Sequence, residues 1–125
     1  MDELNRLVDR YIAAWNEPDP ARRHQLVAET YVEEASYVDP LAQAEGHAAI
    51  EAMIQAVQAQ FPDHLFRRRG GVDGHNGRVR FAWELAGPDG ETKVAGIDFG
   101  MVAADGRFQA LTGFIDGAPP GRLAA

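Results

Sequence analysis

One carboxylate stands inside the most apolar run of the chain. Asp98 lies at the centre of residues 94–102, whose other members are all apolar residues or glycine. Burying such a group costs several kcal/mol unless it is hydrogen-bonded, protonated or facing a wet cavity. Gly96 and Gly100 flank it on the same face of the predicted strand, which leaves space beside the carboxyl for a ligand. Asp98 is therefore a candidate residue of a ligand pocket; the alternative is a buried aspartate tied to a loop backbone.

Two further polar residues stand where they could act on the same ligand. Tyr11 lies on the apolar stripe of the first predicted helix, where the alternative is a core tyrosine whose hydroxyl has a partner. Asp39 precedes Pro40 at the end of a short predicted strand, and Asp-Pro is also a common start of a turn. An aspartate that leads from a strand into a loop can project over a cavity and accept a proton.

Three helices are predicted, over residues 4–15, 21–31 and 46–61. Apolar residues recur at helical spacing along the first and third of them, so each has one face suited to a core. Asp19 and Pro20 are suited to the N-cap and first turn of the second helix, whereas Pro18 and Pro62 end the other two.

The rest of the chain is rich in strand signals. Strands are predicted over residues 35–40, 64–72, 78–86, 93–104 and 107–116, with a loop over 41–45. Helices followed by antiparallel strands with hairpin-length connections indicate an α+β fold, with the three helices on one face of the sheet. The strand at 93–104 is apolar on both sides, so we expect a homodimer that covers the other face.

Composition excludes several classes of function. The 125 residues suffice for one domain, predicted over 1–116 with a flexible tail at 117–125. No cysteine is present, which excludes thiolate chemistry, and a net charge of −7 excludes nucleic acid as the expected partner. No signal peptide or apolar run of the ~20 residues that span a bilayer is evident, so we expect a soluble cytoplasmic protein with no membrane partner. The four histidines lack metal-site spacing, and we expect no metal and no cofactor.

These residues, in this order, resemble the α+β family that includes nuclear transport factor 2, the SnoaL-like polyketide cyclases and the ketosteroid isomerases. The resemblance extends from about Leu4 to Asp116. It implies three helices packed on a strongly curved sheet, a cone-shaped, cystatin-like roll with a central apolar pocket, and dimers formed through the sheet.

Three segments are similar to ketosteroid isomerase in particular. The resemblance implies an oxyanion-hole tyrosine at Tyr11, a general base at Asp39 and a protonated oxyanion-hole aspartic acid at Asp98, a mechanism for which that enzyme is the established example. Where the isomerases carry a supporting tyrosine in the third helix, this chain has Met53-Ile54. The same comparison implies that the pocket lining includes Leu111, Gly113 and Ile115, and further candidates for it are Trp15, Met53, Val57, Phe61 and Trp83.

Three functions remain open at this point. The first is proton-transfer catalysis on a small, largely apolar carbonyl compound, either double-bond isomerisation or an aldol-type cyclisation. The second is binding of a small ligand without catalysis in the same pocket. The third is an interaction module like the transport factor, which an exposed apolar patch beyond the dimer face would mark.

Overall fold

The fold consists of three helices and one six-stranded sheet, in a computed structural model that describes residues 2–117. The sheet has the strand order β2-β1-β6-β5-β4-β3. All neighbouring strands are antiparallel except β1 and β6, which run parallel. The predicted α+β class and mainly antiparallel sheet are thereby confirmed. The elements are α1 (Asp2–Asn16), α2 (Pro20–Thr30), β1 (Tyr31–Val38), β2 (Gln43–Glu45), α3 (His47–Gln60), β3 (Leu65–His75), β4 (Arg78–Ala86), β5 (Thr92–Val102) and β6 (Phe108–Ile115).

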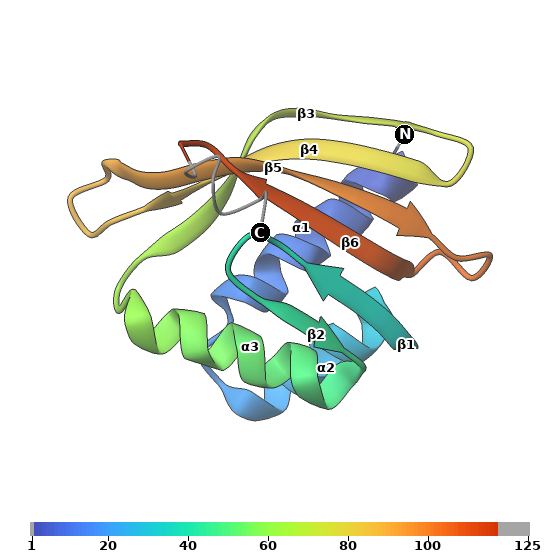
Figure 1. Cartoon of the computed structure of the whole chain (residues 1–125), viewed down its shortest axis with the longest axis horizontal. Coiled ribbons are helices and arrows are strands. Elements are labelled where there is room, and N and C mark those ends of the chain that lie inside the picture. Colours follow the sequence, from blue (N-terminus) through green and yellow to red (C-terminus); the bar gives the residue numbers. More distant parts are fainter. Residues whose placement is uncertain (1, 118–125) are drawn as a thin grey trace.

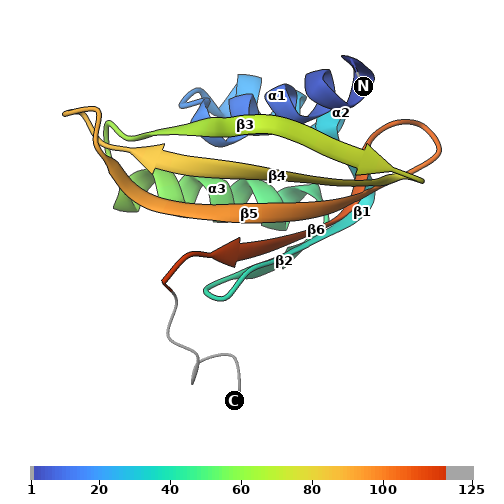
Figure 2. The ribbon, with the colours of Figure 1, turned by 90° about the horizontal axis from the view of Figure 1, so that it is seen from above.

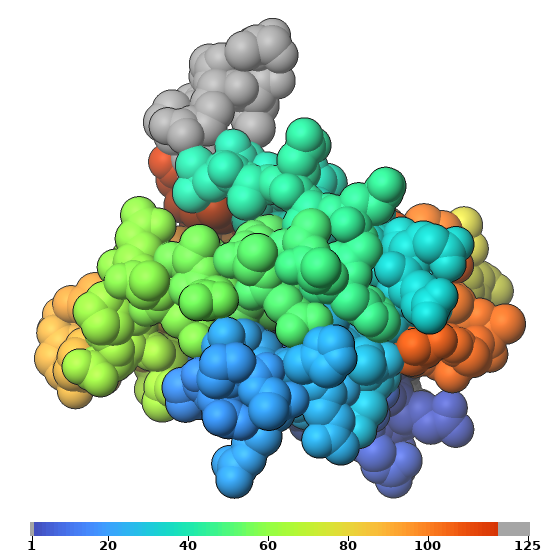
Figure 3. Space-filling view, turned by 90° about the horizontal axis from the view of Figure 1, so that it is seen from below, coloured from blue at the N-terminus to red at the C-terminus, as the bar shows by residue number. Residues whose placement is uncertain are grey.

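The helices occupy one face of the curved sheet (Figure 1). Seen from above, the helices lie behind the strands, and the opposite face of β4 and β5 has no helix over it (Figure 2). From below, α2 and α3 lie side by side and form much of the surface (Figure 3). The core therefore lies between α1, α3 and the inner face of the sheet.

Alternation along the strands builds this core. On β4, Val79, Phe81 and Trp83 are buried, whereas the residues between them are more exposed. The apolar stripe of α1 meets them, and the ring of Tyr11 packs edge-on against Phe81 at a centroid distance of 5.4 Å. Burying one large apolar side chain contributes about 2 kcal/mol, so this interface is a main source of stability.

Side-chain hydrogen bonds fix where α1 ends and α2 begins. Asp19 caps α2 by accepting from the backbone N–H of Arg22 at 3.0 Å, with Pro20 in the first turn. The Asn16 amide bonds to the backbone of Phe66 in both directions, donating to its carbonyl at 2.9 Å and accepting from its N–H at 2.8 Å. This pair of bonds ties the C-terminal end of α1 to the start of β3.

Two boundaries differ from the sequence-based expectation. The loop predicted over 41–45 is wrong at its end, because residues 43–45 form β2 and pair with the end of β1. The second helix, expected to reach Tyr31, ends at Thr30, because the extended backbone of Tyr31 starts β1. In both places, pairing within the sheet outweighs the local pattern.

The space predicted beside Asp98 is also wrong. A Cβ on Gly96 would lie 2.6 Å from a ring carbon of Trp83, and one on Gly100 would lie 2.5 Å from the Phe108 ring. The backbone carbonyl of Phe114 and the Trp83 ring fill the space at Gly96, and the Phe108 ring fills it at Gly100, so both glycines serve close packing.

Two further expectations concern the ends of the chain and membranes. The tail predicted at 117–125 lies, apart from Gly117, outside the described residues. Within residues 2–117, no helix combines the length and apolar character needed to cross a membrane.

Candidate active site

Asp98 projects from β5 into the core. Its exposed fraction is 3%, and each carboxyl oxygen has a hydrogen-bond donor from another element. The Tyr11 hydroxyl of α1 donates to Oδ2 at 2.6 Å, and Nε1 of Trp83 on β4 donates to Oδ1 at 2.9 Å. The side chain is therefore held by other side chains, which excludes the alternative of an aspartate tied to a loop backbone.

Burial sets the protonation of this carboxyl. Desolvation raises the pKa of Asp98 to about 6, although the hydrogen bonds from Tyr11 and Trp83 favour the ionised form, and the nearby charge of Asp39 adds to the rise. Burial likewise raises the pKa of Tyr11, and the charge of Asp98 adds to that effect. Within the physiological pH range, the group of the Tyr11–Asp98 pair that gains or loses a proton is therefore the Asp98 carboxyl.

Asp39 lies in the loop between β1 and β2 and accepts three hydrogen bonds. The Tyr37 hydroxyl donates to Oδ2 at 2.6 Å, and the backbone N–H groups of Leu41 and Ala42 each donate to Oδ1 at 2.8 Å. The two bonds to Oδ1 stabilise the turn that leads into β2. The carboxylate is thus fixed in one orientation while it remains half-buried.

The side chains of Asp39 and Asp98 both lie next to Gly113 of β6. A Cβ on Gly113 would lie 2.9 Å from Oδ1 of Asp98, 3.1 Å from Cβ of Asp39 and 3.4 Å from the Tyr37 hydroxyl. The sheet explains this meeting, because β6 lies between β1 and β5 and pairs Gly113 with Asp98. Any side chain larger than glycine would intrude among the polar groups, so glycine is needed here for close approach.

Sequence reasoning missed Tyr37 as a functional residue. The available signal was its spacing, because residues two apart on a strand share a face and Tyr37 stands two before Asp39. Tyr31, at the start of β1, is a second residue that sequence reasoning did not single out. Burial raises the pKa of its hydroxyl, against hydrogen bonding with Trp15 and Tyr11 that lowers it, so Tyr31 lies in contact with the site.

The predicted lining residues divide into two groups and one separate residue, Phe61. Trp83 and Gly113 touch Asp98, and Trp15 packs on Tyr37 at a ring-centroid distance of 5.7 Å. The second group packs in or against the core: Leu111, which is buried, and Met53, Val57 and Ile115, which are half-buried. Phe61 lies at the C-terminal end of α3 and packs its ring against His64. In residues 2–117 no group of three or more His, Asp or Glu side chains could hold a metal ion.

Comparison with known proteins identifies the family. The profile of the SnoaL-like domain matches residues 8–111, and the chain belongs to that family. Among solved structures, an Agrobacterium tumefaciens protein of the SnoaL-like family is 41% identical, with a TM-score of 0.90 over 94% of this chain and 100% of that one. Among curated proteins, none matches the chain.

More distant structures share the fold. A SnoaL-like protein from Jannaschia is 18% identical, with a TM-score of 0.69 over 93% of this chain and 94% of that one. A Nostoc punctiforme protein described as having a cystatin-like fold is 11% identical, with a TM-score of 0.73 over 94% and 92% of the two chains. The expected fold and family are confirmed.

Proposed function

We propose that the chain catalyses proton transfer on a small, largely apolar carbonyl compound. The observation that carries the proposal is the buried Tyr11–Asp98 pair, held at 2.6 Å, with the side chain of Asp39 beside Gly113 and its charge acting on Asp98. A proton acceptor beside a pair of hydroxyl-type donors is the arrangement that forming and reprotonating an enolate requires.

In the proposed reaction, Asp39 removes a proton from the carbon next to the carbonyl. The electron pair of the broken C–H bond moves into the carbonyl, and its oxygen becomes an enolate. Tyr11 and protonated Asp98 donate hydrogen bonds to that oxygen. Asp39 then returns the proton to another carbon, which gives an isomer. Alternatively, the enolate carbon attacks a second carbonyl, whose electron pair moves to its oxygen, and the proton held by Asp39 goes to that alkoxide, which gives a ring.

The three bonds to Asp39 are compatible with a base. A carboxylate offers about four acceptor sites, so three donors leave one for the proton. The two backbone donors fix the direction of that site, which reduces the ordering needed in the transition state. Tyr37 therefore acts in the proposal as the group that orients Asp39 from the side of the sheet.

Names given to related proteins favour the same chemistry. The Agrobacterium relative carries a provisional name as an isomerase. The Jannaschia protein and one from Sinorhizobium meliloti carry provisional names as polyketide cyclases, and at 18% and 17% identity they share the fold. Isomerisation and cyclisation both begin with an enolate, so the residues in hand serve either.

The test is an assay of the purified protein with 5-ene-3-ketosteroids and small β,γ-unsaturated ketones. We expect Asp39→Asn to lower kcat by at least about a hundredfold, because the amide cannot accept the proton. Asp89→Asn is the matched control, since Asp89 lies in the exposed turn between β4 and β5. Equal turnover by the wild type and Asp39→Asn would remove Asp39 from this role.

The second candidate is a ligand-binding protein without catalysis. It is favoured by the bonding of Asp39, because Oδ1 serves the turn into β2 and Oδ2 accepts from Tyr37 of β1. Saturable binding of the same ketones without turnover, unaffected by Asp39→Asn, would support this candidate over the enzyme.

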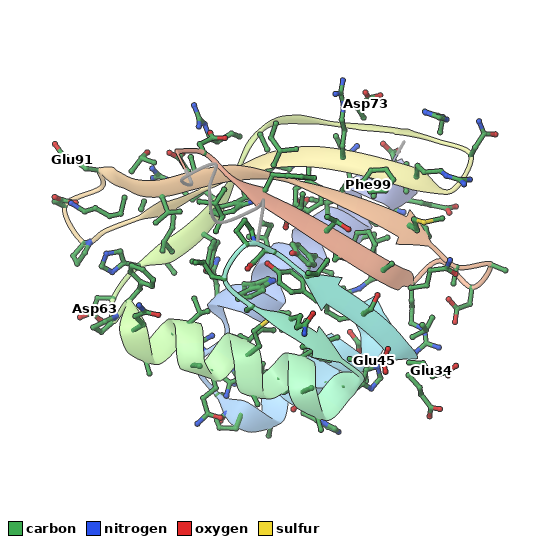
Figure 4. The ribbon with its side chains drawn as sticks, in the orientation of Figure 1. Glu34, Glu45, Asp63, Asp73, Glu91 and Phe99 are labelled. Atoms are coloured by element: carbon green, nitrogen blue, oxygen red, sulfur yellow. The ribbon has the colours of Figure 1, made fainter. Side chains whose placement is uncertain are left out.

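We further propose that the functional unit is a homodimer formed through the outer face of the sheet. Ile97 and Phe114 are 45% and 57% exposed and pair directly across β5 and β6. Phe99, also exposed, follows on β5 (Figure 4) and extends this apolar strip. Such a strip is self-complementary about a two-fold axis.

Light scattering coupled to size exclusion tests the dimer. We expect Phe114→Asp to give a monomer, because each copy would then bury an unpaired charge. Leu65→Asp is the matched control, since Leu65 is also 57% exposed but lies on the edge strand β3. A wild-type monomer, or a dimer that survives Phe114→Asp, would contradict the proposal.

A further inference from the structure

The two oxygens of the Asp98 carboxyl have chemically different partners. Oδ2 faces the Tyr11 hydroxyl at 2.6 Å, and Oδ1 faces Nε1 of Trp83 at 2.9 Å. A hydroxyl can both donate and accept a hydrogen bond, whereas an indole N–H can only donate. A proton on Oδ2 has an acceptor in Tyr11, but a proton on Oδ1 would point at another donor.

The indole of Trp83 is held in this position by its surroundings. Trp83 is buried on β4, and its pairing with Gly96 on β5 brings the ring against the glycine backbone. A Cβ on Gly96 would lie 2.6 Å from a carbon of that ring, and the ring of Phe66 packs on Trp83 at a centroid distance of 5.7 Å. The N–H therefore has little freedom to turn away from Oδ1.

We propose that Trp83 is a positioning residue: its N–H occupies Oδ1 of Asp98 and so confines the acid proton of that carboxyl to Oδ2, against the Tyr11 hydroxyl. This inference rests on the proposed function. A proton on Oδ2 lies on the side of Tyr11, where it can serve an oxygen bound beside the pair. When Asp98 loses this proton, the Tyr11 hydroxyl donates to the carboxylate and is withdrawn from the ligand.

Several other titratable groups face this carboxyl. They are Tyr11 on α1, Tyr31 and Tyr37 on β1, and Asp39 in the loop that follows β1. The three tyrosines have pKa values raised by burial, so they stay neutral near pH 7. Asp39 adds a negative charge that favours the protonated form of Asp98.

The two tryptophans of the chain allow a direct test by NMR. Asp98 accepts from Nε1 of Trp83, whereas the ring of Trp15 packs against Tyr11 and Tyr37, so the Trp83 signal reports directly on this carboxyl. We expect the indole N–H signal of Trp83 to shift with pH at the midpoint of Asp98, near pH 6, and by more than that of Trp15. The Trp83 shift should disappear in Asp98→Asn.

Trp83→Phe removes the N–H and keeps an aromatic ring. We expect it to raise the pKa of Asp98, followed by carbon NMR of its carboxyl, by about one pH unit, because a donor to the ionised form is lost. The pH at which kcat declines on the alkaline side should increase together with this pKa. At lower pH, where Asp98 is protonated, kcat should fall several-fold relative to the wild type, because the proton can also occupy Oδ1. Asp89→Asn, in the exposed turn between β4 and β5, should change neither measurement.

The outcomes separate the two proposals. A Trp83 signal that does not titrate, or that still titrates in Asp98→Asn, would overturn the role of Trp83 whatever the activity. An intact titration in a protein without turnover would overturn the proposed function and leave the contact of Trp83 with Oδ1 as the determinant of where the proton lies.

Discussion

Two tyrosine–aspartate pairs meet beside Gly113 with the same oxygen–oxygen distance of 2.6 Å, yet their surroundings differ. Asp98 lies in the core, and its donors are side chains from two other elements. Asp39 lies in a loop, half-buried, and takes two of its three donors from the backbone. Burial shifts the pKa of Asp98 toward neutrality, whereas the loop amides mainly fix the direction of Asp39. The same tyrosine–aspartate hydrogen bond thus belongs to a carboxyl that can hold a proton at Asp98 and to a carboxylate that is held in one orientation at Asp39.

The largest expected effect on stability comes from Asp98→Asn, which removes the charge of one pair and leaves the other pair intact. Because the pKa of Asp98 is raised from 3.8 to about 6 on folding, the folded state binds its proton more tightly than the unfolded state. This contribution to stability is full below about pH 4, declines between about pH 4 and 6 and is absent above. Asp98→Asn should remove that decline and raise the free energy of unfolding at pH 7 by up to about 3 kcal/mol.

Urea unfolding of the wild type and Asp98→Asn at several pH values measures this difference. The two curves of stability against pH should converge at acid pH and separate as the pH approaches neutrality. A wild type that is as stable as the variant at pH 7 would show that burial of Asp98 carries no such cost.

A second change disrupts both pairs at once. Gly113→Ala places a Cβ 2.9 Å from Oδ1 of Asp98 and 3.1 Å from Cβ of Asp39, so the Asp98 carboxyl must shift and Asp39 must give way slightly. We expect a loss of about 2 kcal/mol in the free energy of unfolding, together with loss of turnover. Gly71→Ala on β3 is the control, because a Cβ there meets nothing within 4 Å and should be close to neutral. Equal stability of the two variants would contradict the crowding at Gly113.

The smallest effect compares the two hydroxyls directly. Tyr11→Phe leaves a buried carboxylate with one donor, which should cost about 2 kcal/mol at pH 7 and less at pH 5, where Asp98 is protonated. Tyr37→Phe should cost only about 1 kcal/mol at pH 7, because Asp39 keeps its two backbone donors. Chemical unfolding of both variants at the two pH values gives the difference, and a smaller loss for Tyr11→Phe at pH 7 would reverse the comparison.

Helical periodicity and strand alternation were sufficient for most of the fold. The stripe of α1 and the alternation of β4 each report a local geometry, and the structure places both faces inward. β2 was missed because its formation depends on the turn that Asp39 closes and on pairing with β1, and neither leaves a pattern in three residues.

The sequence was sufficient to predict the main residues of the candidate site, but not the side chains that pack around them. Asp98 stood out because a carboxylate in an apolar run needs a compensating partner, and that partner proved to be Tyr11. The role of Gly96 was misread because the residue that fills its space, Trp83, comes from the neighbouring strand, and register is not legible from one strand alone. The meeting of Asp39 with Asp98 depends on the parallel pairing of β1 with β6, which is a long-range contact.

The two hydrogen bonds between the Asn16 amide and the backbone of Phe66 determine where Tyr11, the catalytic tyrosine of our proposal, lies relative to the sheet. Tyr11 lies five positions before Asn16 on the same helix, so the anchored end fixes both its height and its bearing over the sheet. Lengthening or shortening α1 by one residue between them would swing the hydroxyl through about 100° and slide it by about 1.5 Å. Substitutions in the strands and loops can therefore adapt the site to new substrates more easily than insertions or deletions in α1 between Tyr11 and Asn16.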